Sequence, residues 1–525
     1  MMGRKPTLAS SGEGQPQQTV MSIRTSLRDY ACTAVALLAV LSGRGTALSQ
    51  EENNIDMWTV APSDLTFAVT QVAPDLAVTQ VAPTDPALTS TEQGTTTLDE
   101  SFGLPSWRYE RPRPILTALE ETKFELNFRT FYFDRSDFSG AEKQAWAIGG
   151  WLGAKTGYFF DHLAFGATVY TSNPIYAPDD RDGTGLLAPG QNGYTVLGEF
   201  YADLRIIQDL NINVGAKGYD TPFINRNDTR MTPNTFEAVV LNGRVPVGNS
   251  STDAGTPTDS VGLSKDGKEV ATPTPTPAQD VGAIRYGLGY FYAIKAQNDS
   301  EFVSMAQDAG ADVQHGVWSA GAIYEKGKFN IGAIEYYCDD VINIVYAQMG
   351  FELRLAPDWK LRFAGQYVDQ GSVGENLLQG HSFSGHQFGV KVELPIRNAL
   401  FTAAFTQAWG TANLQNPWSG YPGYTSVQVQ DFNRAGEGAF LLRAGYDFPW
   451  VDGLNAYALA VFGTDPDLAG QFRQNEFDFN LQWGPKKGVL EGLSLRLRYA
   501  VVQQFGGNVH NLTDFRAICN YVIKF

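Results

Sequence analysis

The last twelve residues are Asp514-Phe515-Arg516-Ala517-Ile518-Cys519-Asn520-Tyr521-Val522-Ile523-Lys524-Phe525, and most of them alternate between apolar and polar side chains. Phe515 and Ile523 share one set of alternate positions, while Arg516 and Lys524 share the other. Side chains one residue apart point to opposite faces of a β-strand. The stretch therefore predicts a strand with one apolar face, one charged face and an aromatic residue at its end.

The same alternation recurs through the preceding 400 or so residues. It is clear in 123–129, 476–483 and 493–499, where charged residues stand one step from apolar ones. In a soluble sandwich the apolar face would pack against a second sheet, whereas in a membrane barrel it faces lipid and the charged face lines a wet lumen. We count eighteen such segments, near 123–133, 146–158, 163–171, 195–207, 211–219, 235–242, 284–295, 317–325, 329–337, 342–355, 359–368, 386–394, 399–408, 438–448, 454–463, 475–484, 492–502 and 513–525.

The connections between these segments alternate in length. Short connections such as 159–162 and 326–328 alternate with long ones such as 220–234 and 409–437. Short turns at one end and long loops at the other are typical of outer-membrane barrels. The sequence therefore predicts an all-β fold, an 18-stranded antiparallel transmembrane β-barrel with short periplasmic turns and long external loops.

One connection departs from this rule. Residues 243–283 fall where a short turn is expected but are rich in Thr-Pro pairs. We interpret them as a disordered periplasmic insertion, with a miscounted strand as the alternative.

The N-terminal part predicts two further regions. Residues 1–49 contain an apolar run at 34–41 after two arginines and before small residues, as in an export signal. Residues 50–110 are rich in Pro, Thr and Ala and repeat Val-Thr-Gln-Val-Ala-Pro, so we expect a disordered periplasmic segment, with a lumen plug or a binding tail as the alternative. The barrel is assigned to 111–525.

Composition narrows the functional classes. Charged residues make up 18% of the chain, and the formal net charge is −17 with a pI of about 4.8. Nucleic-acid binding would need a basic footprint and is disfavoured. After residue 50, no apolar run approaches the ~20 residues that a membrane-spanning helix needs.

In several of its segments the chain resembles the OprD family of substrate-specific outer-membrane porins of Gram-negative bacteria. The strongest match is Thr221-Pro222-Phe223-Ile224-Asn225-Arg226-Asn227-Asp228-Thr229-Arg230-Met231-Thr232-Pro233. Residues 126–133, 298–305, 431–437 and 492–499 also resemble the family. The resemblance runs in register from about 121 to 525, and the N-terminal extension and 243–283 are departures from it.

The resemblance implies a monomeric barrel, with a loose oligomer as the alternative, and a lumen with a ladder of Arg and Lys side chains. It also implies that the matched loop is the third external loop, which folds inward and narrows the lumen. Arg226 and Arg230 are then the candidates for the constriction, with Asp228 between them. Arg434 lies in the segment that resembles the seventh loop.

Strand parity places further basic side chains on the inward face. Each can either contact a passing anion or pair with an inward carboxylate, and parity alone leaves both readings open. The inward set is Arg129, Arg205, Lys217, Arg354, Arg362, Lys391, Arg443, Arg496, Arg498 and Arg516. The candidate substrate-binding residues are Arg226, Arg230, Asp228, Arg129, Arg362, Lys391, Arg434, Arg443, Arg496 and Arg498.

We therefore expect a cell-outer-membrane channel through which small, carboxylate-bearing solutes such as organic acids and amino acids diffuse. Its other expected partners are outer-membrane lipid, lipopolysaccharide and, during insertion, the barrel-assembly machinery. We predict no catalytic residues, no cofactor, no metal site and no nucleic-acid partner. The alternative is an outer-membrane barrel that acts as an enzyme or as a surface receptor or adhesin without general conduction.

Overall fold

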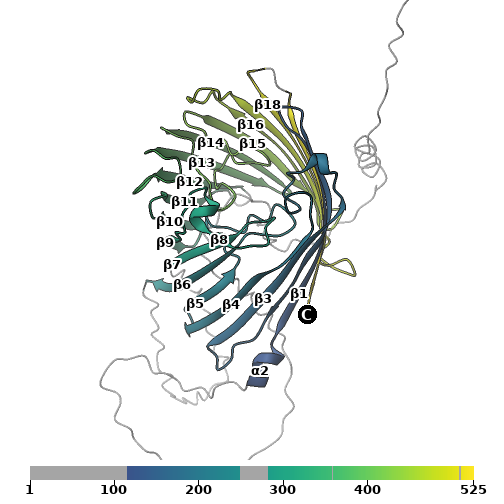
Figure 1. Ribbon diagram of the computed structural model, residues 1–525, viewed down its shortest axis with the longest axis vertical. Coiled ribbons are helices and arrows are strands. Elements are labelled where there is room, and N and C mark those ends of the chain that lie inside the picture. Colours follow the sequence, from purple (N-terminus) through teal and green to yellow (C-terminus); the bar gives the residue numbers. More distant parts are fainter. Residues whose placement is uncertain (1–114, 249–281, 357–358, 508–509) are drawn as a thin grey trace, which may run out of the picture. The chain divides into compact units, whose positions relative to one another are not determined.

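The computed structural model describes residues 115–248, 282–356, 359–507 and 510–525. A short helix, α2 (Ile115–Glu120), precedes a sheet whose strands follow one another in sequence order (Figure 1). The strands are β1 (Lys123–Ser136), β2 (Glu142–Lys155), β3 (Leu163–Tyr176), β4 (Tyr194–Ile207), β5 (Leu210–Lys217), β6 (Thr235–Val247), β7 (Gly282–Lys295), β8 (Val303–Ser304), β9 (Val317–Lys326), β10 (Phe329–Cys338), β11 (Ile342–Ala356), β12 (Trp359–Gly371), β13 (Ser384–Ile396), β14 (Ala399–Gly410), β15 (Gly438–Asp447), β16 (Leu454–Gly463), β17 (Gln474–Trp483), β18 (Leu493–Gln504) and β19 (Leu512–Lys524).

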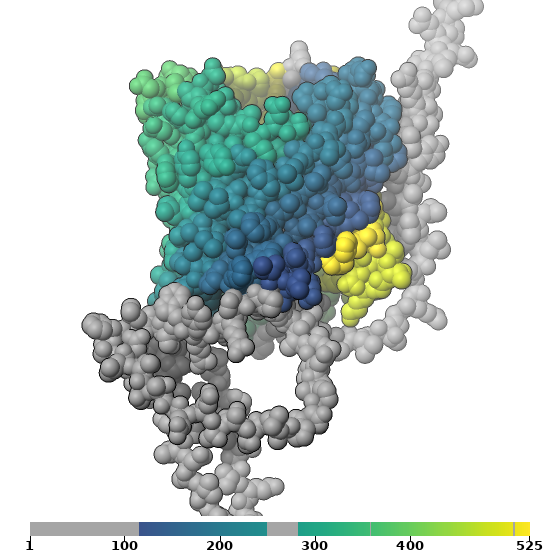
Figure 2. Space-filling view, turned by 60° about the horizontal axis from the view of Figure 1, so that its bottom comes forward, coloured from purple at the N-terminus to yellow at the C-terminus, as the bar shows by residue number. Residues whose placement is uncertain are grey.

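The sheet closes on itself into a barrel. Strand β1 pairs antiparallel with β2 on one side and with β19 on the other, from Glu125 opposite Lys524 to Ser136 opposite Thr513. Figure 2 shows the first and last strands, in blue and yellow, side by side in the wall. Closure leaves no free strand edge in the wall, which is a requirement for a sheet surrounded by lipid.

The predicted fold is confirmed. Among the described residues, eighteen strands of 8 to 15 residues build the wall, and each corresponds to a predicted segment. The two-residue β8 is an additional strand that pairs with the end of β7. The expected difference between short turns at one end and long connections at the other is also present.

The boundaries of the predicted insertion differ from expectation. Strands β6 and β7 pair directly, and their pairing continues to Val247 opposite Gly282. Residues 243–247 and 282–283 thus belong to strands of the wall. The hydrogen-bonded pairing of β6 and β7 continues beyond the stretch in which apolar and polar residues clearly alternate. The remaining residues, 249–281, and the predicted N-terminal regions 1–49 and 50–110 lie outside the described residues.

Within the described residues, no helix is long and apolar enough to cross a membrane. A helical turn, α3 (Met305–Asp308), follows β8 inside the connection from β7 to β9.

The wall residues follow the alternation of the sequence. In β1, Phe128 points outward with 55% of its side chain exposed, while Asn127 and Arg129 are buried on the inner face. Phe131 and Phe133, which share the parity of Arg129, are also buried inside. The lumen is therefore polar in some sectors and apolar in others.

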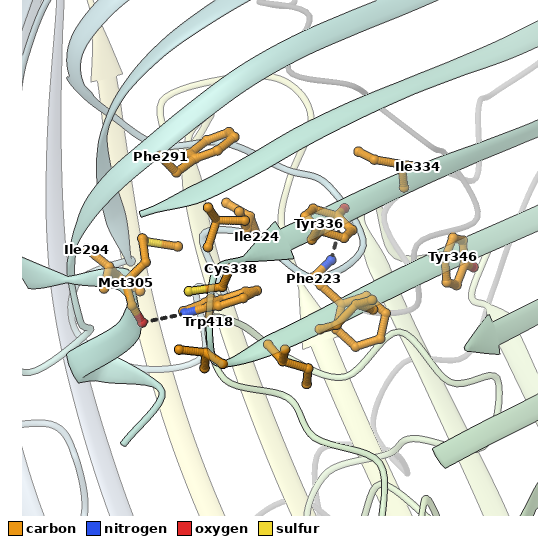
Figure 3. Packing of buried hydrophobic residues seen from close by; sticks show 14 of the residues in the cluster. Phe223, Ile224, Phe291, Ile294, Met305, Ile334, Tyr336, Cys338, Tyr346 and Trp418 are labelled. Atoms are coloured by element: carbon orange, nitrogen blue, oxygen red, sulfur yellow. Dashed lines mark hydrogen bonds between the residues drawn. The ribbon is translucent and has the colours of Figure 1, made fainter. Parts of the chain in front are cut away.

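An apolar cluster fills one side of the barrel interior (Figure 3). It joins the inner faces of β6, β7 and β9–β12 to side chains from four long connections, among them Phe223, Met305 and Trp418. The indole Nε1–H of Trp418 donates to the carbonyl of Met305 at 2.8 Å.

Candidate solute-binding site

The third connection at the long-loop end of the barrel, L3 (218–234, between β5 and β6), begins with a tight turn. The backbone N–H and the hydroxyl of Thr221 both donate to the carbonyl of Ile224, at 2.8 Å each. Pro222 occupies the second position of this turn, where its fixed φ is favourable. The turn presents Phe223 and Ile224 as an apolar tip, and both are fully buried.

The tip of L3 docks on the wall strands β10 and β11. The ring of Phe223 lies 6.0 Å from that of Tyr336 and 6.3 Å from that of Tyr346, with edge-on geometry in both pairs. The backbone N–H of Phe223 donates to the Tyr336 hydroxyl at 3.3 Å, as Figure 3 shows. Tyr421 of the connection L7 (411–437, between β14 and β15) packs on a further side of Phe223, with ring centroids 5.9 Å apart. The apolar cluster therefore holds one end of L3.

A charged contact holds the other end. Arg129 on β1 donates to both carboxylate oxygens of Asp228, at 2.5 and 2.8 Å. Its guanidinium also donates to the carbonyl of Arg230 at 2.7 Å, and its Nε donates to Asn520 on β19 at 2.6 Å. L3 thus crosses the interior from β10–β11 to β1–β19 and narrows the lumen, in line with the expectation for this loop.

L7 also folds inward. The backbone N–H groups of Val429 and Gln430 donate to the two carboxylate oxygens of Glu476 on β17, at 2.8 Å each. The backbone N–H of Gln428 donates to Asp478 at 3.1 Å. These buried carboxylates thus bind the backbone of L7.

Arg226 lies at the centre of L3 with 46% of its side chain exposed. It pairs with Asp220 at 3.2 Å, and its stem lies against Gly218. A Cβ atom at position 218 would approach Nε of Arg226 to 2.3 Å, so the glycine makes room for this guanidinium.

Arg230 points away from Arg226. Its Nε donates to the carbonyl of Thr184 at 2.9 Å, and its guanidinium lies over the ring of Phe133 at 5.2 Å. Burial, followed by the neighbouring Arg516 and Arg135, lowers the pKa of Arg230 from its ordinary value. A guanidinium nevertheless stays charged at neutral pH. Arg230 therefore adds positive charge to a group of arginines on the wall.

That group lies on β18 and β19. Arg498 and Arg516 are direct cross-strand partners, and Arg516 is held by Asp514 at 2.7 Å and by the carbonyl of Gln428 at 3.1 Å. Nε of Arg496 donates to Asn480 at 2.6 Å. Arg498 is 8% exposed, and its Nε is buried with no hydrogen-bond acceptor in the described structure.

Four other candidates are ion-paired or stacked. Arg362 pairs with Glu352 at 3.4 Å, Lys391 pairs with Glu393 at 3.2 Å, and Arg434 pairs with Glu437. The guanidinium of Arg443 lies over the ring of Tyr457 at 4.1 Å. The paired arginines hold the wall and loops together. Arg230, Arg496 and Arg498, in contrast, have no ion pair with a carboxylate among the described residues. The assignment of substrate contacts to individual residues stays a prediction.

Two residues of this region were not singled out from the sequence. Asp514 is fully buried between Arg516 and Arg135, and Arg135 pairs with it at 2.6 Å. Asp514 has the inward parity of Arg516, and Arg135 has that of Arg129. Parity within the predicted segment 513–525 could have identified Asp514, whereas Arg135 lies two residues beyond the predicted segment 123–133.

Comparisons with known proteins agree with this geometry. Residues 277–525 match the family described as outer membrane porin, OprD family. The match assigns the part of the barrel from β7 to β19 to the OprD family. The chain is accordingly an outer-membrane protein, and its barrel is a channel for small solutes. Family and fold favour a channel over an enzyme.

Solved structures show the same fold. OccK9 (OpdG) of Pseudomonas aeruginosa is 21% identical, with a TM-score of 0.63, and the match covers 78% of this chain and 100% of that one. A BenF-like porin from Pseudomonas fluorescens Pf-5 is 18% identical, with a TM-score of 0.64 and the same coverage. OpdK of Pseudomonas aeruginosa, solved with vanillate, is 18% identical, with a TM-score of 0.61 and again the same coverage. A comparison of the sequence with curated proteins gives no match.

Proposed function

We propose that this porin passes small carboxylate-bearing anions along the arginines of L3, β18 and β19. The observation that carries the proposal is the absence of carboxylate partners. Among the described residues, no ion pair joins Arg230, Arg496 or Arg498 to an aspartate or glutamate. Wall arginines that serve only the fold are expected to be paired, because an unpaired buried charge is costly.

The buried carboxylates near this group already have other partners. Asp514 is shared by Arg516 and Arg135, and Glu476 is occupied by two backbone N–H groups of L7. A mobile carboxylate would gain from this field, since the effective dielectric in a narrow pore is below that of bulk water. Arginine also offers a planar fork that binds carboxylates in a bidentate way.

The path begins at Arg226, the most exposed of the loop arginines, and continues along Arg498 and Arg496. Arg230, Arg443 and Asp228 line or shape this path in our proposal. Arg129, Arg362, Lys391 and Arg434 are secondary contacts in our proposal. Each pairs with a carboxylate, as Arg226 does with Asp220, but none of the four lies on L3, β18 or β19. Vanillate, found in OpdK, carries a carboxylate and belongs to the class of solute proposed here.

The experiment is a planar-bilayer recording of the full-length protein with benzoate as the probe. We expect discrete conductance steps that benzoate blocks, and weaker block in Arg496→Gln/Arg498→Gln. Arg285→Gln, a wall arginine paired with Glu325 and not among the candidate contacts, is the matched control and should be blocked like the wild type. Equal block of all three proteins would refute the proposed path. A silent bilayer from folded barrel would favour a receptor or an enzyme.

The remaining expectations are proposals of the same kind. We propose that the barrel works as a monomer, contacts lipopolysaccharide with its external surface and is inserted by the barrel-assembly machinery. We also propose that 1–49 is an export signal and that 50–110 is a periplasmic segment dispensable for conduction. Deleting 51–104 should leave the single-channel conductance unchanged, and an increase would identify this segment as a plug.

A further inference from the structure

We infer that His315, Asp339 and Asp340 form a binding site for a divalent transition-metal ion at the long-loop end of the barrel. One ring nitrogen of His315 and one oxygen of each carboxylate lie within 4.8 Å of one another. His315 lies at the end of L4 (296–316, between β7 and β9), and the two aspartates lie in the short connection between β10 and β11. Residues distant in the sequence thus bring three ligand atoms to one point.

The histidine is oriented as a metal ligand requires. Its Nδ1 lies 2.9 Å from the backbone carbonyl of Asp339. Because a carbonyl oxygen only accepts, Nδ1 must carry the proton in this contact, and Nε2 keeps its lone pair. A ring N–H that donates to a backbone carbonyl is the usual arrangement of histidines that bind metals through the other nitrogen.

Each aspartate accepts a hydrogen bond through one carboxylate oxygen, which leaves the other oxygen able to bind a metal ion. The hydroxyl of Tyr337 donates to Oδ1 of Asp339 at 3.1 Å, and the backbone N–H of Glu375 donates to Oδ1 of Asp340 at 3.0 Å. In the part of the chain that the structure describes, neither Oδ2 atom has a hydrogen bond, and neither carboxylate has an ion pair. Two adjacent carboxylates without a cation repel each other, so a bound divalent ion would remove an unfavourable interaction.

The donor set selects the class of ion. One imidazole nitrogen and two carboxylate oxygens suit Zn²⁺, Mn²⁺ or Ni²⁺ with water in the open positions, whereas Ca²⁺ prefers six to eight oxygen ligands. Glu375 belongs to L6 (372–383, between β12 and β13), so the ion would join three connections. Val341 and Ile342, next to the aspartates, are fully buried in the apolar cluster, which gives the site a rigid base.

The test uses full-length, tag-free, metal-stripped protein in detergent and Zn²⁺ as the probe, titrated by calorimetry with Mg²⁺ in excess. We expect one Zn²⁺ per chain and binding weakened by about tenfold or more in His315→Ala and in Asp339→Asn. His381→Ala is the matched control. The Nδ1 of His381 contacts the Gln379 carbonyl at the same 2.9 Å, but His381 belongs to no candidate metal-binding cluster among the described residues. Binding in this control should equal that of the wild type.

Two results would overturn the inference. One is the absence of a stoichiometric Zn²⁺ site in the wild type. The other is wild-type affinity in both His315→Ala and Asp339→Asn. Each variant is first shown to conduct in planar bilayers like the wild type without Zn²⁺, so that loss of binding reports loss of a ligand and not loss of the barrel. X-ray absorption at the zinc edge should then show a single imidazole among oxygen ligands.

Discussion

Arg129 and Asp228 form a two-pronged contact, at 2.5 and 2.8 Å, that fixes L3 to the first strand of the barrel. The two residues are 99 positions apart in the sequence. The arginine is buried and also binds the Arg230 carbonyl, so one side chain holds both the charge and the backbone of the loop. This contact and the packing of Phe223 fix L3 at both ends, so that the loop crosses the lumen.

Removing the contact between Arg129 and Asp228 should increase the mobility of L3. In Arg129→Ala, Asp228 and the Arg230 carbonyl lose their donor, at a cost of about 1–3 kcal/mol for the local contact. We expect a larger and noisier single-channel conductance. The control is Arg285→Ala, which removes an arginine–glutamate pair within the wall, between β7 and β9. Similar noise in both variants would show that Arg129 has no special role in holding L3.

Removing the packing of Phe223 should also increase the mobility of L3. Phe223→Ala leaves a cavity among Tyr336, Tyr346 and Tyr421 and should lower the free energy of unfolding by about 3–5 kcal/mol. Electrical recordings should show more frequent transitions between conductance levels. Phe128→Ala removes the same side chain from the lipid-facing surface and should leave the recordings unchanged. Quiet channels in Phe223→Ala would mean that the Arg129–Asp228 contact alone holds L3.

L4 should respond to pH through Asp308. Burial, and then Asp299, raise the pKa of Asp308 to about 6. A carboxyl with a raised pKa contributes most stability below its unfolded value, and this contribution is lost as the pH rises through about 6. L4 should therefore be better protected from hydrogen exchange at pH 5 than at pH 7.5, after correction for the intrinsic rates.

Asp308→Asn provides the comparison, because the amide stays neutral at both pH values. Protection of 303–310 in this variant should then change little between pH 5 and pH 7.5. The same pH dependence in wild type and variant would assign it to another group.

The barrel itself was predictable from local patterns. Alternation in stretches such as 476–483 determines which face meets lipid, because a one-residue shift would put every charged side chain on the wrong side. The same parity correctly predicted that Arg129, Arg498 and Arg516 point inward. Strand ends were less certain, as β6 shows, because pairing continues where alternation is weak.

The arrangement of apolar and polar sectors inside the barrel was not predictable from local patterns. Phe131 and Phe133 share the inward parity of Arg129, yet they pack under Leu186 and Met231 from long connections. Parity cannot show which loop covers which sector, nor that Glu476 binds the backbone of L7. These relationships arise from loop folding between distant segments, for which a single sequence carries no periodic signal.

Arginines without a carboxylate partner should make the lumen selective for anions in spite of a net charge of −17. The reversal potential of the full-length channel in a KCl gradient measures this selectivity. We expect a potential of the sign given by chloride permeating faster than potassium, and a shift toward zero in Arg496→Gln/Arg498→Gln. A preference for potassium in the wild type would refute the proposed anion selectivity.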